Sequence, residues 1–233
     1  MMLFCALTLT GVLSHEPWYD EAQSWLISQD LSFLGLLNYM KYEGHLFLWY
    51  FLLMPFTKLY MPYPMPMLFL NMFFMWCAVF VLWKKFPLNN ILKILITFSV
   101  PICYQYAVVA RCYSVGILLL FLLTVLYKEK LQRPYLYTCL ILLCANTSVM
   151  ALIGASAFGL LFFIEYLTKI KNFYKTKQFW LLCLISASGI ALILYQLLGA
   201  DEEIKVLSVF HTPDTSLNLI INTISYGISN FYT

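Results

Sequence analysis

Two adjacent acids, Asp20 and Glu21, follow the first apolar run of the chain and are its leading candidates for catalysis. Pro17 suits the first position of a helix, and acids in a first turn face the positive end of the helix dipole, so a helix is expected to begin here. A carboxylate that is partly desolvated beside a membrane surface can act as a general base or bind a divalent cation. The alternative is that both acids only stabilise the start of this helix.

Apolar residues of the same helix predict how it lies. Trp18, Ala22, Trp25 and Leu26 have the i, i+4, i+7, i+8 spacing of a single helix face. We therefore expect the helix to lie flat on the membrane, with this face toward the lipid headgroups. Asp20 would then point away from the lipid.

A second group of candidates is Glu43-Gly44-His45, which brings a carboxylate and an imidazole into one turn. Such a pair can bind a metal ion or an acceptor substrate. The alternative is a solvated turn in which the glycine supplies a positive φ angle.

Arg111 comes directly before an apolar run of about 16 residues, and we expect it to start a helix. An unpaired guanidinium near the membrane interface costs several kcal/mol, so it either extends to the headgroups or binds an anion. A lipid phosphate at this depth is a natural partner for its planar set of donors.

Composition indicates what must position these groups. Of 233 residues, 62% are hydrophobic and 11% are charged, whereas soluble domains have about 25% charged residues. A membrane helix needs about 20 apolar residues, so we predict an all-α, polytopic transmembrane helical bundle with about eight spans. Residues 117–126 are apolar on every face, which excludes a β-barrel. The net charge of +3 is dispersed along the chain, so nucleic acid is not expected as a partner.

The chain is expected to form a single membrane domain, residues 1–233. After a first span that ends near Ser14, residues 15–66 form a long external loop with interfacial helices, and residues 67–233 hold transmembrane helices. The run 46–60 contains Pro55 and Lys58 and is read as a surface helix. The later spans are expected at residues 65–83, 91–105, 110–127, 135–145, 149–167, 179–198 and from 217 onward, with a hairpin turn at 146–148.

The distribution of charge predicts the orientation. If the spans alternate, ten of the fourteen basic residues lie in loops on one side, which the positive-inside rule assigns to the cytoplasm. Nine of the eleven acids lie on the other side. We therefore expect a multi-pass protein of the cell membrane with cytoplasmic basic loops and with the loop 15–66 outside. A further acidic group with a histidine, at 201–203 and 211, would be a second external loop or a solvated face.

The order of the motifs resembles the GT-C superfamily of membrane glycosyltransferases, which includes protein O-mannosyltransferases and aminoarabinose transferases. The matching elements are Tyr-Asp-Glu-Ala-Gln at 19–23, Glu-Gly-His-Leu at 43–46 before a surface helix, and Ala-Arg-Cys-Tyr-Ser at 110–114, which is similar to bacterial members. The resemblance covers most of the first 170 residues. The chain departs from it at Leu46, where members commonly have proline. It also stops within an apolar run, so we expect it to be an N-terminal portion of a longer protein.

The resemblance implies an inverting transfer of a hexose or pentose from a polyprenyl-phosphate donor to a glycan, lipid or protein acceptor at the external face. Asp20 would be the catalytic residue, with Glu21 as its partner. Arg111, with Tyr113 in the same motif, would contact the donor.

Glu43 and His45 would line the acceptor side or a site for Mg²⁺ or Mn²⁺; no metal ligands are assigned. The alternatives are a transporter or flippase-like protein and an inactive fragment of a GT-C enzyme. Transporters usually place charges near the middle of the membrane, whereas the charges here lie at span ends and in loops.

Overall fold

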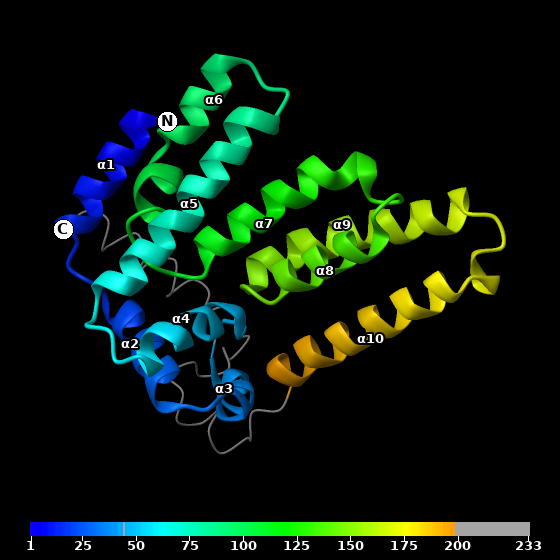
Figure 1. Cartoon of the computed structure of the whole chain (residues 1–233), viewed down its shortest axis with the longest axis horizontal. Helices are drawn as coiled ribbons and strands as arrows, with labels where there is room; N and C mark the ends of the chain where they lie inside the picture. Colours follow the sequence, from blue (N-terminus) through cyan, green and yellow to red (C-terminus); the bar gives the residue numbers. More distant parts are fainter. Residues whose placement is uncertain (44, 199–233) are drawn as a thin grey trace, which may run out of the picture. The chain divides into compact units, whose positions relative to one another are not determined.

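The computed structural model describes residues 1–43 and 45–198, and within these residues the secondary structure is helical, without strands (Figure 1). Residues Met1–Leu197 form one compact unit. The predicted last span from Leu217 and the acidic group with His211 lie outside the described residues. The all-α prediction is confirmed for the described part of the chain, while the single domain over 1–233 stays a prediction.

Three helices of the described residues are long and apolar enough to cross a membrane: α5 (Met65–Lys85), α9 (Val149–Lys169) and α10 (Lys177–Leu197). Each has 21 residues, which corresponds to about 31 Å of helix, close to the thickness of a bilayer core. The helices α1 (Met2–Leu13), α7 (Tyr113–Leu126) and α8 (Pro134–Ala145) are apolar but shorter. Eight spans therefore stay a prediction.

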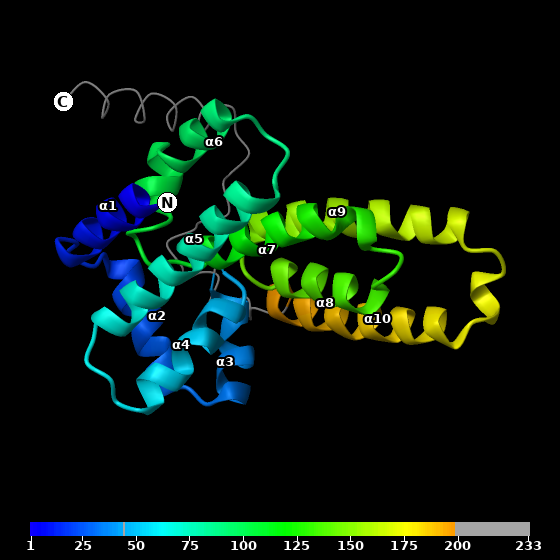
Figure 2. The same ribbon diagram turned by 45° about the horizontal axis from the view of Figure 1, so that its top comes forward.

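The region between α1 and α5 holds α2 (Tyr19–Asp30), α3 (Phe33–Tyr39), a 3₁₀ turn (Met40–Tyr42) and α4 (Leu48–Lys58). These short helices pack against one another, with α2 beside α4 in both ribbon views (Figures 1 and 2). The helix predicted at 46–60 is α4, and its 11 residues are too few to cross a bilayer.

Two predictions about α2 are wrong. The helix begins at Tyr19 with Trp18 as its N-cap residue, so Pro17 lies outside it, because the Glu21 side chain accepts a hydrogen bond from the Trp18 N–H and fixes the start there. The apolar residues expected to face the lipid together also differ in exposure. Leu26 is 54% exposed but Trp25 is 4% exposed and packs against Tyr63.

The span predicted at 91–105 is broken. The helix α6 (Asn90–Thr97) ends before Pro101, which starts a short π-helical turn, Pro101–Gln105. Proline lacks an N–H and clashes with the carbonyl four residues earlier, so an α-helix cannot continue past Thr97 undisturbed. The chain then runs without regular structure to α7, which starts at Tyr113. Arg111 therefore precedes the helix and does not start it, contrary to the prediction.

The remaining helices form a bundle around α7 and α8. α7 packs against α5, α8 and α9, while α8 contacts both α9 and α10 (Figure 2). The predicted hairpin turn at 146–148 is confirmed, and the Ser148 hydroxyl caps α9 by accepting the Ala151 N–H at 3.2 Å. A Cβ atom on Gly189 would lie 2.5 Å from the Leu142 side chain, so glycine at this position permits the close approach of α10 to α8.

Candidate functional site

Glu21 is fully buried and joins two distant segments of the chain. Its Oε1 accepts the Ala110 N–H at 2.6 Å, and its Oε2 accepts the Trp18 N–H at 2.7 Å and lies 2.8 Å from His15 Nε2. Hydrogen bonds to a buried carboxylate are among the stronger ones in proteins. Glu21 therefore fixes the start of α2 against the segment that carries Arg111.

Asp20, the neighbour of Glu21, faces the other way and forms an ion pair with Arg111. Its Oδ2 lies 3.1 Å from Arg111 Nη1, and the two side chains are 49% and 24% exposed. The second terminal nitrogen of Arg111 lies 2.8 Å from His45 Nε2. The three predicted residues Asp20, Arg111 and His45 thus meet, although 91 residues separate the first from the second.

The contact with Arg111 determines the tautomer of His45. A guanidinium only donates hydrogen bonds, so Nε2 accepts and the proton of the neutral ring lies on Nδ1. Nδ1 is buried and has no hydrogen-bond partner among the described residues. Burial lowers the pKa of His45 below its ordinary 6.5, and the charge of Arg111 lowers it further. His45 is therefore a neutral donor at Nδ1 and is not available as a base at Nε2.

Tyr113 lies against both partners of this contact. Its ring meets the His45 ring edge to face at 5.9 Å, and the Arg111 guanidinium carbon lies 5.4 Å from its centroid. A guanidinium near an aromatic ring is attracted to the electron-rich face. Tyr113 thus holds the Arg111 side chain from the side of α7.

Glu43 lies next to this group without contacting Arg111. It accepts hydrogen bonds from Gln23 at 2.9 Å and from the Tyr50 hydroxyl at 3.3 Å. Burial raises the pKa of Glu43 above its ordinary value, and these two hydrogen bonds oppose the shift. A cavity of about 260 Å³ runs along the same face of α2 and is lined by Gln23, Tyr19 and Tyr39, among others.

Asn71, a buried residue of α5, supports the segment before Arg111. Its side-chain amide donates to the carbonyl oxygens of Tyr106, Ala107 and Val109 at 3.0–3.2 Å. These carbonyls lie in the irregular segment before α7, where no helix supplies N–H donors for them. The Asn71 amide therefore provides their hydrogen bonds. The sequence contained a signal for this residue, since Asn71 is the one amide in the apolar run 65–83 and polar groups within such runs are usually functional or structural.

The loop that carries His45 is held from the opposite side by Gln196 of α10. Gln196 Oε1 accepts the Phe47 N–H, and its amide donates to Asn146 Oδ1, both at 2.9 Å. The Asn146 carbonyl accepts the Leu48 N–H at 3.1 Å, and an isolated bridge pairs His45 with Ser148. The turn 146–148 is buried and positions His45. Sequence reasoning missed Gln196, His15 and Gln23.

The described residues do not fit a divalent cation. Among them no three His, Cys, Asp or Glu side chains come together as a group of ligands. Asp20 and His45, the natural donors, both contact the Arg111 guanidinium, whose positive charge would repel a cation at this point.

No protein-family model, curated protein or solved structure matches the chain.

Proposed function

We propose that the chain is part of a membrane glycosyltransferase that moves a hexose or pentose from a polyprenyl-phosphate donor to an acceptor at the external face of the cell membrane. The observation that supports this most is the partly exposed contact of Asp20 with Arg111, with neutral His45 on the other side of the guanidinium. It combines a candidate base with a group that binds phosphate. The order of motifs shared with GT-C enzymes is the reason for naming a lipid-linked sugar.

Donor binding would separate the ion pair. The Arg111 guanidinium offers a planar set of donors that suits a phosphate as well as a carboxylate. The donor phosphate is a diester with a single negative charge, as on the Asp20 carboxylate, and its oxygens would compete with Asp20 for Arg111. Binding of the donor therefore frees Asp20, so that the base becomes available only when the donor is present.

The chemical step then follows as a single displacement. An acceptor hydroxyl gives its proton to the Asp20 carboxylate while its oxygen forms a bond to the anomeric carbon of the sugar. The bond from this carbon to the phosphate oxygen breaks, and the polyprenyl phosphate leaves with the electron pair. Arg111 stabilises the charge that develops on this oxygen, while His45 Nε2 holds the guanidinium in place, and the configuration at the anomeric carbon inverts.

The acceptor would approach along α2. Two residues that line the cavity, Tyr19 and Gln23, lie one residue before and three residues after Asp20 in the sequence. The Gln23 side chain also donates a hydrogen bond to Glu43. A carboxyl group with a raised pKa and a tyrosine hydroxyl at 3.3 Å offer hydrogen bonds to sugar or side-chain hydroxyls. Glu43 is accordingly the proposed contact for the acceptor.

The test is the binding of undecaprenyl phosphate to the purified protein in phosphatidylcholine nanodiscs. Arg111→Gln should weaken this binding about 10- to 100-fold, because a charge-assisted hydrogen bond contributes about 1.5–3 kcal/mol. The control is Arg133→Gln, which removes a 63% exposed guanidinium paired with Glu129 and should leave binding unchanged. Equal affinity of Arg111→Gln and the wild type, or no binding by the wild type, would refute the proposal.

A further inference from the structure

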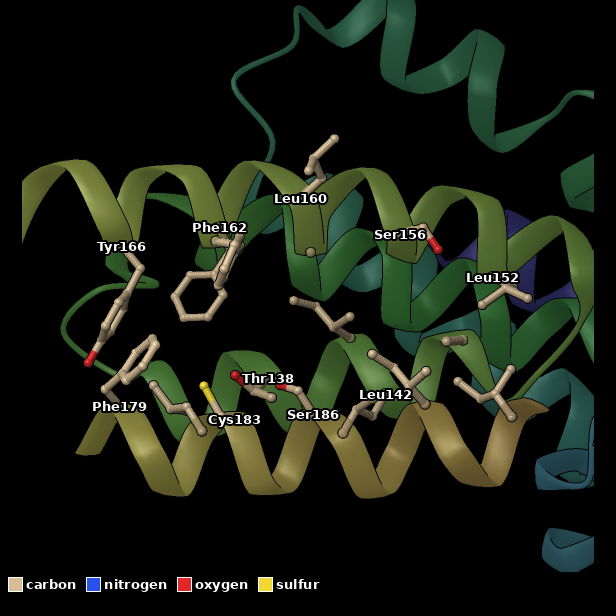
Figure 3. A pocket seen from close by; sticks show the side chains of 17 residues that line it. Thr138, Leu142, Leu152, Ser156, Leu160, Phe162, Tyr166, Phe179, Cys183 and Ser186 are labelled. Atoms are coloured by element: carbon tan, nitrogen blue, oxygen red, sulfur yellow. The ribbon is translucent and has the colours of Figure 1, made fainter. Parts of the chain in front are cut away.

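A cavity of about 460 Å³ lies between α9 and α10, with α8 along its side (Figure 3). Its inner wall is buried, since Phe162, Leu182 and Ile193 are 5–8% exposed. Its rim is apolar and open, since Leu160 and Phe163 are at least 50% exposed. We call this cavity the α9–α10 slot. Both helices that border it are candidate membrane spans, so its open side would face lipid.

The dimensions of the slot suit a hydrocarbon chain. It extends along α10 from Phe179 to Ile193, which is about 21 Å at the helical rise per residue. One leaflet of a bilayer core is about 15 Å thick. Water fills a cavity of this kind poorly, because it needs two to four polar partners.

A tyrosine hydroxyl lies at one end of the slot. Tyr166 and Phe179 lie there (Figure 3), with their rings stacked at 6.2 Å between centroids. The Tyr166 hydroxyl is buried and has no hydrogen-bond partner among the described residues, and the same is true of the Thr138 hydroxyl, which also lines the slot. A buried hydroxyl without a partner is costly, so both groups indicate a ligand that carries oxygen atoms.

This end of the slot is also the basic end. Lys169 closes α9 three residues after Tyr166, and Lys177 opens α10 two residues before Phe179. Lys171 and Lys175 are exposed in the connection between them. Clusters of lysines at the end of a membrane helix attract anionic lipid headgroups.

We propose that the α9–α10 slot binds one acyl chain of an anionic phospholipid, with the headgroup at the lysine-rich connection and the chain directed toward Ile193. This lipid is distinct from a sugar donor at Arg111, and its binding does not depend on the proposed function. Binding of this lipid would also affect α10. Ile193 lies one turn before Gln196, which holds the loop of His45, so a bound chain would stabilise the helix that positions this loop.

The test uses the protein in phosphatidylcholine nanodiscs that contain a phosphatidylglycerol with a diazirine on one acyl chain. After photolysis, mass spectrometry should locate the label on slot residues of α9 and α10. An excess of unlabelled phosphatidylglycerol should reduce this label at least fivefold, while phosphatidylcholine should not. Label that phosphatidylcholine displaces equally well, or cross-links that connect residues 199–233 to the slot in place of lipid, would overturn the proposal.

Binding of the acyl chain and binding of the headgroup are tested with different variants. Ser186→Phe should fill the slot and reduce labelling at least fivefold, whereas Leu184→Phe, on an exposed part of α10 outside the slot, should not. Gly159→Leu is a second filling variant, since a Cβ atom there first meets Ile141 at 3.6 Å. Normal labelling of both filling variants would contradict the proposal.

The lysines are tested by Lys175→Gln combined with Lys177→Gln. The preference for phosphatidylglycerol should fall about fivefold for each lysine removed. The matched control is Lys84→Gln with Lys85→Gln, two exposed lysines at the end of α5, which should leave the preference unchanged. A preference that survives in the first pair would overturn the assignment of the headgroup.

Discussion

Replacement of Glu21 is the sharpest test of how the site is built. The carboxylate is fully buried and contacts the N–H groups of Ala110 and Trp18 and the ring of His15 within 2.8 Å. Glu21→Ala would leave three polar groups without their partner, among them the buried Ala110 N–H. Each hydrogen bond to a charged group contributes about 1.5–3 kcal/mol, and such contributions do not add fully.

We therefore expect Glu21→Ala to lower the free energy of unfolding by about 3–5 kcal/mol, which is less than the sum of three such hydrogen bonds because their contributions do not add fully. Glu21→Gln keeps one acceptor oxygen but turns an amide N–H₂ toward a second donor, so about 2 kcal/mol is expected. The assay is urea unfolding in detergent micelles, followed by tryptophan fluorescence. The control is Glu16→Gln, an exposed acid five residues earlier, with an expected change below about 0.5 kcal/mol. A loss below 1 kcal/mol for Glu21→Ala would refute the role of Glu21 as the connection between α2 and Ala110.

Three further predictions follow from neighbouring contacts. Asn71→Leu should destabilise the protein by about 2 kcal/mol, because it removes the donor to three buried carbonyls; thermal unfolding measures it, and an unchanged transition would contradict it. Because the folded-state pKa of His45 lies below 6.5, its contribution to stability is complete above pH 6.5 and is lost as the pH falls toward that lower value. Unfolding of wild type and His45→Gln between pH 5 and 8 should therefore differ in slope only on the acid side, and identical slopes would contradict it. For topology, Glu16→Cys and Lys84→Cys in a cysteine-free background should react with a membrane-impermeant maleimide from opposite sides, whereas labelling from one side would reject the predicted orientation.

The long apolar helices could be predicted from the sequence to within about two residues. The predicted spans 65–83, 149–167 and 179–198 correspond to α5, α9 and α10, because the length of an uninterrupted apolar run directly limits the length of a buried helix. The turn at 146–148 was also predictable from length, because the 33 residues from 135 to 167 are too many for a single span.

The start of α2 was not predictable from local pattern. It depends on the Glu21 side chain, which accepts the Trp18 N–H and also the Ala110 N–H, 89 residues away in the sequence. Trp25 was misplaced because its spacing fits a lipid-facing stripe equally well, and only packing against Tyr63 decides its side. Local periodicity does not contain such long-range contacts.

Of the candidate site, the sequence identified Asp20, Arg111, His45 and Tyr113, and the structure brings all four together. The sequence did not distinguish the roles of the two adjacent acids. Asp20 and Glu21 are consecutive residues of α2 and point in different directions, so Glu21 is buried while Asp20 is half exposed. What remained hidden was the polar support from Gln196 and other distant residues, because an amide in a helix does not indicate its partner.

The central claim is that Asp20 and Arg111 form a site of sugar transfer from a lipid phosphate. The most direct measurement is the release of polyprenyl phosphate from a panel of polyprenyl-phosphate hexoses and pentoses, supplied to membranes that contain the wild type, Asp20→Asn or the control Glu16→Gln, an exposed acid outside the α2 cavity, at equal protein levels. We predict release with at least one donor by the wild type and by Glu16→Gln, and at least a 100-fold lower rate for Asp20→Asn. No release from any donor by the wild type, or equal rates for Asp20→Asn and the wild type, would contradict the claim.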